Sequence, residues 1–164
     1  MTMVRETSSG ALTEMRSMLG FLRSEDSGSS APQPGIDQLD ELVEHTRNTG
    51  LSVDFRTAGQ RPRLSTGVEL TVYRVIQEAL TNTRKHAGQD SNAVVELTFD
   101  RSSVDVQVVD DGGSPPTDQS SDSRGHGLTG MRERISAYGG TLETGHIATG
   151  GFRVRAWIPV GDQR

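Results

Sequence analysis

The sequence has no cysteine among its 164 residues, which excludes disulfide frameworks, thiolate metal sites and cysteine nucleophiles. Aromatic residues make up only 4% and hydrophobic residues 32% of the chain, so we expect an aliphatic core and a large share of loops. No apolar run approaches the roughly 20 residues of a membrane helix, and the first ten residues lack the apolar stretch of a secretion signal. These absences favour a soluble domain in a reducing cytoplasm.

Basic residues are also scarce. The chain carries 17 Lys and Arg against 22 Asp and Glu, a formal net charge of -5, and its pI is near 5.3. A nucleic-acid surface needs Lys and Arg clustered on one face. We therefore expect no nucleic-acid partner, and any anionic ligand should be held by a few local groups.

Composition divides the chain into four parts. Residues 1–23 end in an amphipathic helix expected from residue 7. Residues 24–36 form a linker, because eight of these thirteen residues are Ser, Gly or Pro. One domain should follow over residues 37–160, and residues 161–164 form a tail.

Hydrophobic periodicity predicts a domain of alternating strands and helices. The long central helix should begin at Thr66, which has capping-box spacing to Glu69, and stop before Gly88. This order predicts an α/β fold, more strictly an α+β sandwich, with a mixed, largely antiparallel sheet and helices packed on one face. The expected helices span 37–48, 66–86 and 128–138, and the expected strands 51–56, 93–99, 104–109, 141–147 and 152–159.

Polar side chains line one border of the central helix. At 100° per residue, Glu78, Asn82 and Lys85 lie within about 40° of one another beside the apolar face. An acid, an amide and a cation in one stripe are consistent with an ordinary solvated flank. The solvated flank is the favoured interpretation of the stripe alone, and a functional site needs support from the rest of the chain.

A second feature is the sequence VVDDGG over residues 108–113. It places Asp110 at the end of a valine-rich strand and Gly112 where the backbone can approach a ligand. Asp-Asp-Gly is also a good turn sequence. Both interpretations stay open from this motif alone.

A third feature is GHGLTGM over residues 125–131, in which small residues lead into a predicted helix. Exposed N–H groups at a helix start form an anion site suited to phosphates. The segment also spells the G-x-G-x-x-G of dinucleotide-binding folds. That alternative fails because residues 114–124 contain no aliphatic residue to form the preceding strand, and only 34 residues follow Gly130.

In this order, the features resemble the ATP-binding catalytic domain shared by sensor histidine kinases, Hsp90-like chaperones, type II topoisomerases and MutL-type repair proteins. Residues 73–87 look like the N box of that family, 110–112 like its G1 box, 125–134 like its G2 box and 150–159 like its G3 region. The N and G2 boxes are most similar to the NarL/DesK-like branch of two-component histidine kinases. The resemblance implies the Bergerat-type ATP-binding fold.

The resemblance also implies roles for individual residues. Asn82 would coordinate Mg²⁺ between the phosphates of ATP, and Glu78 beside it would orient a metal-bound water or polarise the incoming nucleophile. Lys85 would meet phosphate oxygens, and Asp110 would accept a hydrogen bond from the adenine amino group. Gly112 would give the backbone room at the base.

The remaining family positions belong to the same ATP site. Gly125, Gly127 and Gly130 would let the lid and helix start close on the phosphates, and His126 lies between the first two. Leu128 and Met131 are expected to anchor the lid or the core. For His86, a direct ligand contact and simple packing at the helix end both stay open. Ser114 departs from the family, which often has glycine at that place.

The resemblance implies a protein-histidine kinase. The domain would bind Mg-ATP and transfer the γ-phosphoryl group to a histidine on its own or a partner protomer's helix, for relay to a response regulator. Residues 11–23 resemble the end of the second helix of the phosphoacceptor domain. None of the four histidines stands at a phosphoacceptor motif. We therefore expect a monomeric cytoplasmic fragment of a homodimeric sensor that cannot autophosphorylate alone; membrane anchoring of the parent stays open.

Two rival functions are compatible with this fold. An anti-sigma-factor serine kinase is disfavoured by residues 11–23, because such proteins begin directly with the catalytic domain. A module that senses a nucleotide without transferring phosphate is disfavoured because Glu78, Asn82, Lys85 and Asp110 are all present.

Overall fold

The computed structural model describes residues 33–87, 90–112 and 124–161, with the side chains of 124–126 left out. The predictions for the N-terminal helix, most of the linker, the stop at Gly88, the lid around Ser114 and the end of the tail lie outside these residues. Within the described ranges, no helix has the length and apolar character needed to cross a membrane.

The predicted strands and helices of the domain are present. Their ends differ from the predicted ones by no more than two residues, except at the start of the last helix. The elements are η1 (Ile36–Gln38), α2 (Leu39–Asn48), β1 (Ser52–Ala58), α3 (Thr66–His86), β2 (Asn92–Phe99), β3 (Ser103–Asp110), α4 (Arg124–Ser136), β4 (Thr141–His146) and β5 (Phe152–Pro159).

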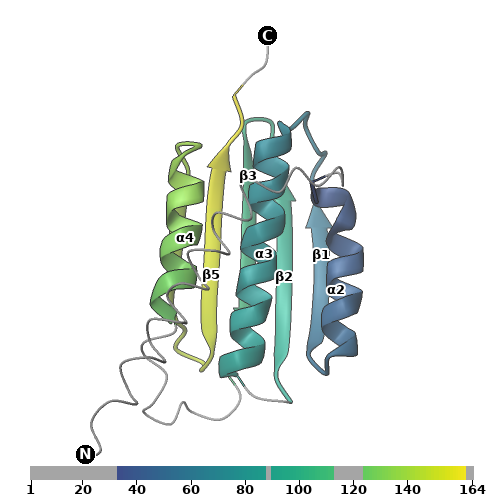
Figure 1. The fold of residues 1–164 in the computed structure, drawn as a ribbon, viewed down its shortest axis with the longest axis vertical. Coiled ribbons are helices and arrows are strands. Elements are labelled where there is room, and N and C mark those ends of the chain that lie inside the picture. The colour runs from purple at the N-terminus through teal and green to yellow at the C-terminus, as the bar shows by residue number, and fades with distance from the viewer. Residues whose placement is uncertain (1–32, 88–89, 113–123, 162–164) are drawn as a thin grey trace, which may run out of the picture. The chain divides into compact units, whose positions relative to one another are not determined.

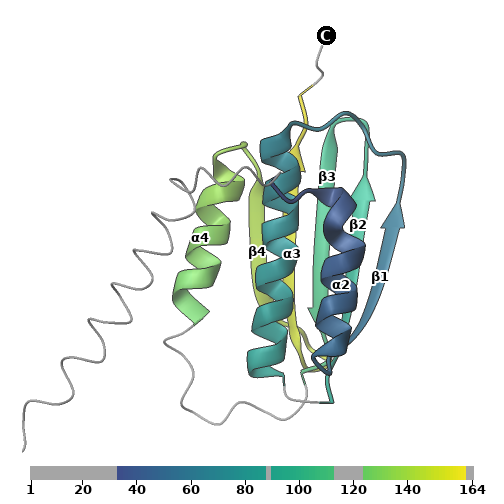
Figure 2. The same cartoon turned by 45° about the vertical axis from the view of Figure 1, so that its right-hand side comes forward.

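The strands form one mixed sheet in the order β1-β2-β3-β5-β4. Only β1 and β2 are parallel, and the other three pairs are antiparallel. Figures 1 and 2 show α2, α3 and α4 side by side over the same face of this sheet. The predicted fold class is therefore confirmed.

The core lies between this sheet face and the helices. Along β3, Val104, Val106 and Val108 are buried at every second position, as expected when alternate side chains point to the same face. On α3, Val72 and Ile76 are fully buried. Burying such aliphatic side chains supplies most of the stability, at about 25 cal/mol per Å² of apolar surface. The next inward position on β3 is Asp110, so the strand directs a carboxylate toward α3.

The start of α3 corrects the predicted capping box. The N-cap is Ser65, whose backbone is extended and whose Oγ accepts from the Val68 N–H at 3.3 Å. Thr66 is already helical, and Glu69 instead binds Arg61 at 2.6 Å. Burial lowers the pKa of Arg61, but its ion pairs raise it by more, so the net pKa is raised. Glu69 therefore ties the preceding loop to the helix.

The start of α4 also differs from the prediction. The helix begins at Arg124 and not near Leu128, so the glycine-rich segment lies within it. Helical glycine costs about 1 kcal/mol relative to alanine, but Met131 and Ile135, one turn apart, are fully buried in the core and offset this cost. Only the first turn of a helix leaves its N–H groups without helical partners. An anion could therefore be bound by the backbone at 124–127, but not at Gly130.

Candidate functional site

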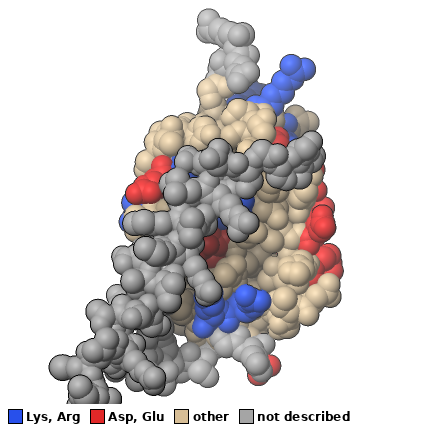
Figure 3. All heavy atoms as spheres, viewed as in Figure 1, with Lys and Arg blue, Asp and Glu red and all other residues tan. Residues whose placement is uncertain are grey.

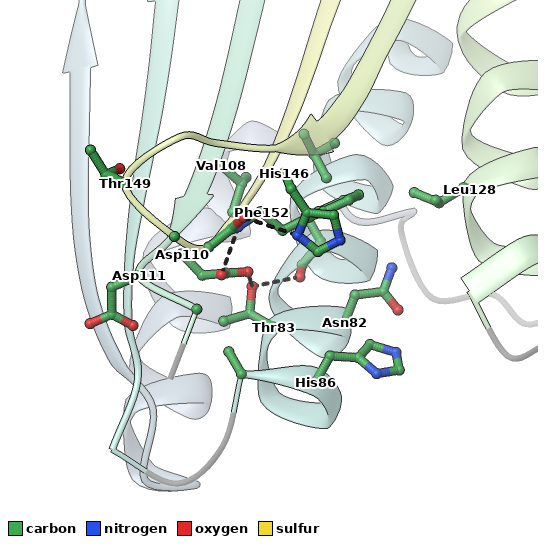
Figure 4. Close-up of a pocket in the computed structure, with 16 residues that line it drawn as sticks. Asn82, Thr83, His86, Val108, Asp110, Asp111, Leu128, His146, Thr149 and Phe152 are labelled. Atoms are coloured by element: carbon green, nitrogen blue, oxygen red, sulfur yellow. Dashed lines mark hydrogen bonds between the residues drawn. The ribbon is translucent and has the colours of Figure 1, made fainter. Parts of the chain in front are cut away.

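A cavity of about 400 Å³ opens where α3 ends, between the end of β3, the turn joining β4 to β5, and α4 (Figure 4). Among the predicted site residues whose side chains the structure describes, five line it: Asn82, His86, Asp110, Gly112 and Leu128. The other lining residues are Ala79, Thr83, Ala87, Val108, Asp111, His146, Thr149, Gly150, Gly151, Phe152 and Val154.

Asp110 is held in place by two hydrogen bonds from different parts of the chain. Its side chain is at the inner face of β3, and the residue is only 7% exposed. Oδ1 accepts from the backbone N–H of Phe152 at 3.0 Å, and Oδ2 accepts from the hydroxyl of Thr83 at 3.2 Å. A carboxylate can accept about four hydrogen bonds, so both oxygens retain capacity for a donor from the cavity.

The neighbouring carboxylate has a different role. Asp111 accepts from the backbone N–H of Asn92 at 3.0 Å and from its side-chain amide at 2.7 Å. These bonds join the end of β3 to the start of β2. The two aspartates of the motif therefore differ: the Asp111 carboxylate binds Asn92, whereas the buried Asp110 carboxylate binds Thr83 and Phe152.

Glycines let the end of β3 approach the turn before β5. Gly112 and Gly151 both have positive φ, at 79° and 100°, a conformation that glycine adopts without steric cost. A side chain on Gly151 would overlap the carbonyl oxygen of Asp110, and one on Gly112 would overlap the backbone of Gly151. Gly112 thus has a structural use within the chain itself, in addition to any room that it gives a ligand.

The cavity has a polar side formed by the end of α3. Figure 4 shows Asn82 and His86 projecting from α3 on the side where Leu128 of α4 lies, whereas Asp110 lies beside Thr83 and Phe152. Lys85 is exposed in the same last turn, which also holds Arg84. Figure 3 shows basic side chains gathered where α3 ends. The Asn82 amide therefore lines this end of the cavity, and cationic side chains suited to an anion lie in the same last turn of α3, outside the lining.

Glu78 lies one turn before Asn82 and is half-buried against α4. It does not line the cavity, but a side chain added at Gly127 would overlap its Oε1. Gly127 thus allows the acid of α3 to sit directly against the backbone of α4. This contact brings the predicted N and G2 boxes together.

Other predicted residues occupy different positions. Gly125 and His126 belong to the first turn of α4, and Gly130 lies further along that helix. Met131 is fully buried in the core, as expected of an anchor. Among the residues whose side chains the structure describes, Gly130, Met131 and Lys85 do not line the cavity.

Sequence reasoning missed three prominent lining residues. Thr83 is the hydroxyl partner of Asp110, and its signal was a polar residue within the buried stripe of α3. His146 and Phe152 form an edge-to-face pair with ring centroids 5.2 Å apart. Nothing in their local sequence marks them, because the pair forms only when β4 and β5 come into register.

The donor set fits Mg²⁺ bound together with a phosphate ligand. Among the described residues, no three His, Cys, Asp or Glu side chains cluster as a protein-only metal site would require. The cavity offers the amide oxygen of Asn82, with the Glu78 carboxylate one turn away. Mg²⁺ typically keeps several waters and takes one or two protein oxygens plus substrate phosphates, which agrees with this sparse set.

Comparison with known proteins places the chain. The model of the family described as histidine kinase-, DNA gyrase B- and HSP90-like ATPase matches residues 67–162. Sensor histidine kinase YxjM of Bacillus subtilis (strain 168) is 32% identical over 151 residues, which cover 91% of this chain and 35% of the relative. The histidine-protein kinase/phosphatase UhpB of Salmonella typhimurium is 34% identical over 160 residues, which cover 96% of this chain and 30% of the relative.

Solved structures agree at the level of the fold. The blue-light activated histidine kinase of Erythrobacter litoralis EL346 superposes with a TM-score of 0.60 at 20% identity, over 80% of this chain and 47% of that one. The mycobacterial sensor histidine kinase MprB superposes with a TM-score of 0.56 at 16% identity, over 75% of this chain and 93% of that one. The chain spans about a third of the length of the two curated relatives, 35% and 30%.

The three boxes, the sheet order and these matches agree with one another, and they confirm the resemblance predicted from the sequence. The chain belongs to the family of histidine kinase-, DNA gyrase B- and HSP90-like ATPases, and it corresponds to the ATP-binding catalytic domain of a sensor histidine kinase.

Proposed function

We propose that the cavity binds ATP and that the domain transfers the γ-phosphoryl group to a histidine of a phosphoacceptor domain in the same parent protein. The observation that carries this proposal is the division of the cavity. A buried carboxylate, Asp110, lies at one side, and the polar groups Asn82 and His86 lie at the other. A nucleotide has the matching division into a base with hydrogen-bond donors and a polyanionic chain.

Asp110 is the proposed reader of the base. It is fixed by the Thr83 hydroxyl and the Phe152 N–H, and its remaining lone pairs can accept from the exocyclic amine of adenine. Guanine presents a carbonyl oxygen at that place, which a carboxylate repels. The site therefore favours adenine.

The phosphates would lie toward Asn82, the basic end of α3 and the first turn of α4. Lys85 and the N–H groups in the first turn of α4 supply positive charge there. Asn82 directly, and Glu78 through a water, would hold Mg²⁺, which when bound neutralises charge on the phosphates. His86 lines this side and can contact the ligand.

Positioning and electrostatics are the main contributions expected of a phosphoryl-transfer site. Glu78, at the junction of α3 and α4, is placed to polarise the incoming nucleophile or to orient a water. The sensor histidine kinases among the relatives favour a histidine acceptor over the serine acceptor of an anti-sigma-factor kinase. The simultaneous presence of Glu78, Asn82 and Asp110 weighs against a module that only senses nucleotide.

The proposed partners follow from this reaction. The phosphohistidine would pass its phosphoryl group to an aspartate of a response regulator, and the parent protein would be a homodimer whose catalytic domain lies in the cytoplasm. The 164-residue chain alone should be monomeric.

Labelled ATP tests phosphotransfer. The chain alone should gain no phosphohistidine, whereas an added phosphoacceptor domain from the same parent should acquire an acid-labile, alkali-stable label. Transfer should be slow because the effective concentration of a tethered domain is lost. A stable phosphohistidine on the chain itself, or no label on the added domain, would contradict the proposal.

Substituting Gly127→Ala should separate stability from activity. Alanine is favoured over glycine in a helix by about 1 kcal/mol, so thermal unfolding should shift upward or stay unchanged. The new methyl would displace the flexible carboxylate of Glu78, so phosphotransfer should fall by about tenfold or more, a typical contribution of a positioned acid or base being at least about 10².

Gly130→Ala is the matched control. Among the described residues, a methyl there would meet the Arg134 guanidinium at 3.8 Å and not Glu78, so the same helix gains the same propensity without moving Glu78. Equal phosphotransfer by the two variants would show that the Glu78 contact with α4 has no catalytic consequence.

A further inference from the structure

Thr83 makes an unusual bond for a threonine in a helix. Three threonines of α3 donate back to the carbonyl one turn earlier: Thr71 to Gly67 at 2.8 Å, Thr81 to Gln77 at 2.8 Å, and Thr83 to Ala79 at 3.1 Å. Such back-bonding is ordinary and needs no function. Among these three, only Thr83 also meets a carboxylate, Oδ2 of Asp110 at 3.2 Å.

The contact joins two parts of the cavity wall that are 27 residues apart in sequence. Thr83 is 4% exposed and Asp110 is 7% exposed, so little water is available to replace the hydroxyl. A hydroxyl carries a single hydrogen, which it can give to the Ala79 carbonyl or to the carboxylate. Bonds to a charged acceptor are the stronger, so the carboxylate competes well for that hydrogen.

We propose that Thr83 is a positioning residue that sets the base selectivity of the site by fixing the orientation of the Asp110 carboxylate. This inference rests on the proposed function of Asp110 as the reader of adenine. The N box would then serve both ends of the nucleotide: Asn82 contacts the metal and phosphates, and Thr83, the next residue, orients the carboxylate that binds the base.

The reason is geometric. The terminal torsion of an aspartate is broad, and the Phe152 N–H holds only Oδ1. With Thr83 on Oδ2, the carboxylate has one donor on each oxygen from the protein, and its plane is fixed. Without the hydroxyl, Oδ2 can swing away from the base or take up a stray water, and the distinction between an amine and a carbonyl weakens.

Competition of ATP and GTP against a fluorescent ATP analogue tests this, with the ratio of the two affinities as readout. In Thr83→Val, which keeps the shape and loses the hydroxyl, the ratio should fall by about threefold to tenfold. In Thr83→Ser, which keeps the hydroxyl, it should stay within about twofold of the parent. A packing role predicts the reverse order, because serine leaves a methyl-sized gap and valine leaves none.

Thr71→Val is the matched control. Thr71 is also 4% exposed, its hydroxyl donates to the Gly67 carbonyl, and it does not line the cavity. The ratio of ATP to GTP affinity in Thr71→Val should equal that of the parent. Partial unfolding of any variant lowers both apparent affinities by the same factor, so the ratio is insensitive to stability. If Thr83→Val does not fold, Thr83→Ala is a second hydroxyl-free variant and should give the same reduced ratio.

The variant Asp110→Asn distinguishes the two claims. If it lowers the ratio while Thr83→Val leaves it at the parental value, Thr83 does not orient Asp110 and the present inference is overturned alone. If Asp110→Asn leaves the ratio unchanged, the assignment of Asp110 to the base fails, and the role of Thr83 fails with it.

Discussion

Asn82→Ala should abolish the tightening of ATP binding by Mg²⁺ and reduce phosphotransfer to an added phosphoacceptor domain by at least about a hundredfold, as expected for a group that stabilises transition-state charge. The amide lines the cavity and is half-buried at the border of α3, outside the core. The fold should therefore persist. Calorimetric titration with ATP, with and without Mg²⁺, measures the effect independently of turnover.

Gln77→Ala provides the control for this prediction. Gln77 carries a carboxamide on the same helix, is also half-buried, and binds Arg74 at 2.9 Å instead of lining the cavity. Its removal should leave the Mg²⁺ dependence at the parental level. If ATP binding by Asn82→Ala and by the parent depends on Mg²⁺ to the same extent, Asn82 does not hold the metal.

Asp110→Asn should weaken ATP binding and narrow its advantage over GTP. The parent should prefer ATP by roughly tenfold to a hundredfold, because a hydrogen bond to a charged group contributes about 1.5–3 kcal/mol and about 1.4 kcal/mol corresponds to one decade. The asparagine oxygen can still accept from the Phe152 N–H, and its nitrogen can donate to Thr83, whose hydroxyl then bonds Ala79. The fold should survive, and the second amide hydrogen can face guanine.

The competition assay for this variant needs a control on the same strand. Asp105→Asn makes the identical chemical change, but Asp105 binds Arg155 and does not line the cavity. Its ATP-to-GTP ratio should match the parent. If Asp110 served only the turn, Asp110→Asn would alter thermal stability and leave the ratio untouched.

The sequence was most informative about site residues whose chemistry can be recognised from their position in a single helix or strand. The residue pattern made Asn82 and Asp110 candidates, and the family resemblance then assigned them to an ATP site. The structure brings both into one cavity. The alternation of Val104, Val106 and Val108 also predicts that Asp110 faces inward, since side chains on a strand alternate between faces.

Local propensity misled the prediction of the start of α4 and of the cap of α3. Glycines at 125 and 127 argue for a loop before Leu128, but α4 extends back through them to Arg124, and its Met131 and Ile135 are fully buried. Tertiary packing outweighs propensities of this size. At α3, Ser65 and Thr66 are both good caps, and the extended backbone at Ser65 decided between them.

Long-range pairing explains what the sequence could not show. The bond from Thr83 to Asp110 depends on how α3 packs on β3. The approach of Gly151 to the end of β3 depends on where β5 meets β3. No local pattern encodes a partner 27 or more residues away. Such contacts shape the base side of the cavity, whereas the polar side comes mainly from α3 and could be predicted.

The most direct test of the account is a calorimetric titration of the 164-residue chain with Mg-ATP and, separately, with Mg-GTP. We expect one site per chain for ATP, and binding of GTP weaker by roughly tenfold or more. An absence of ATP binding under conditions where the chain is folded, or equal affinities for the two nucleotides, would contradict the assignment of this cavity to ATP with its base at Asp110.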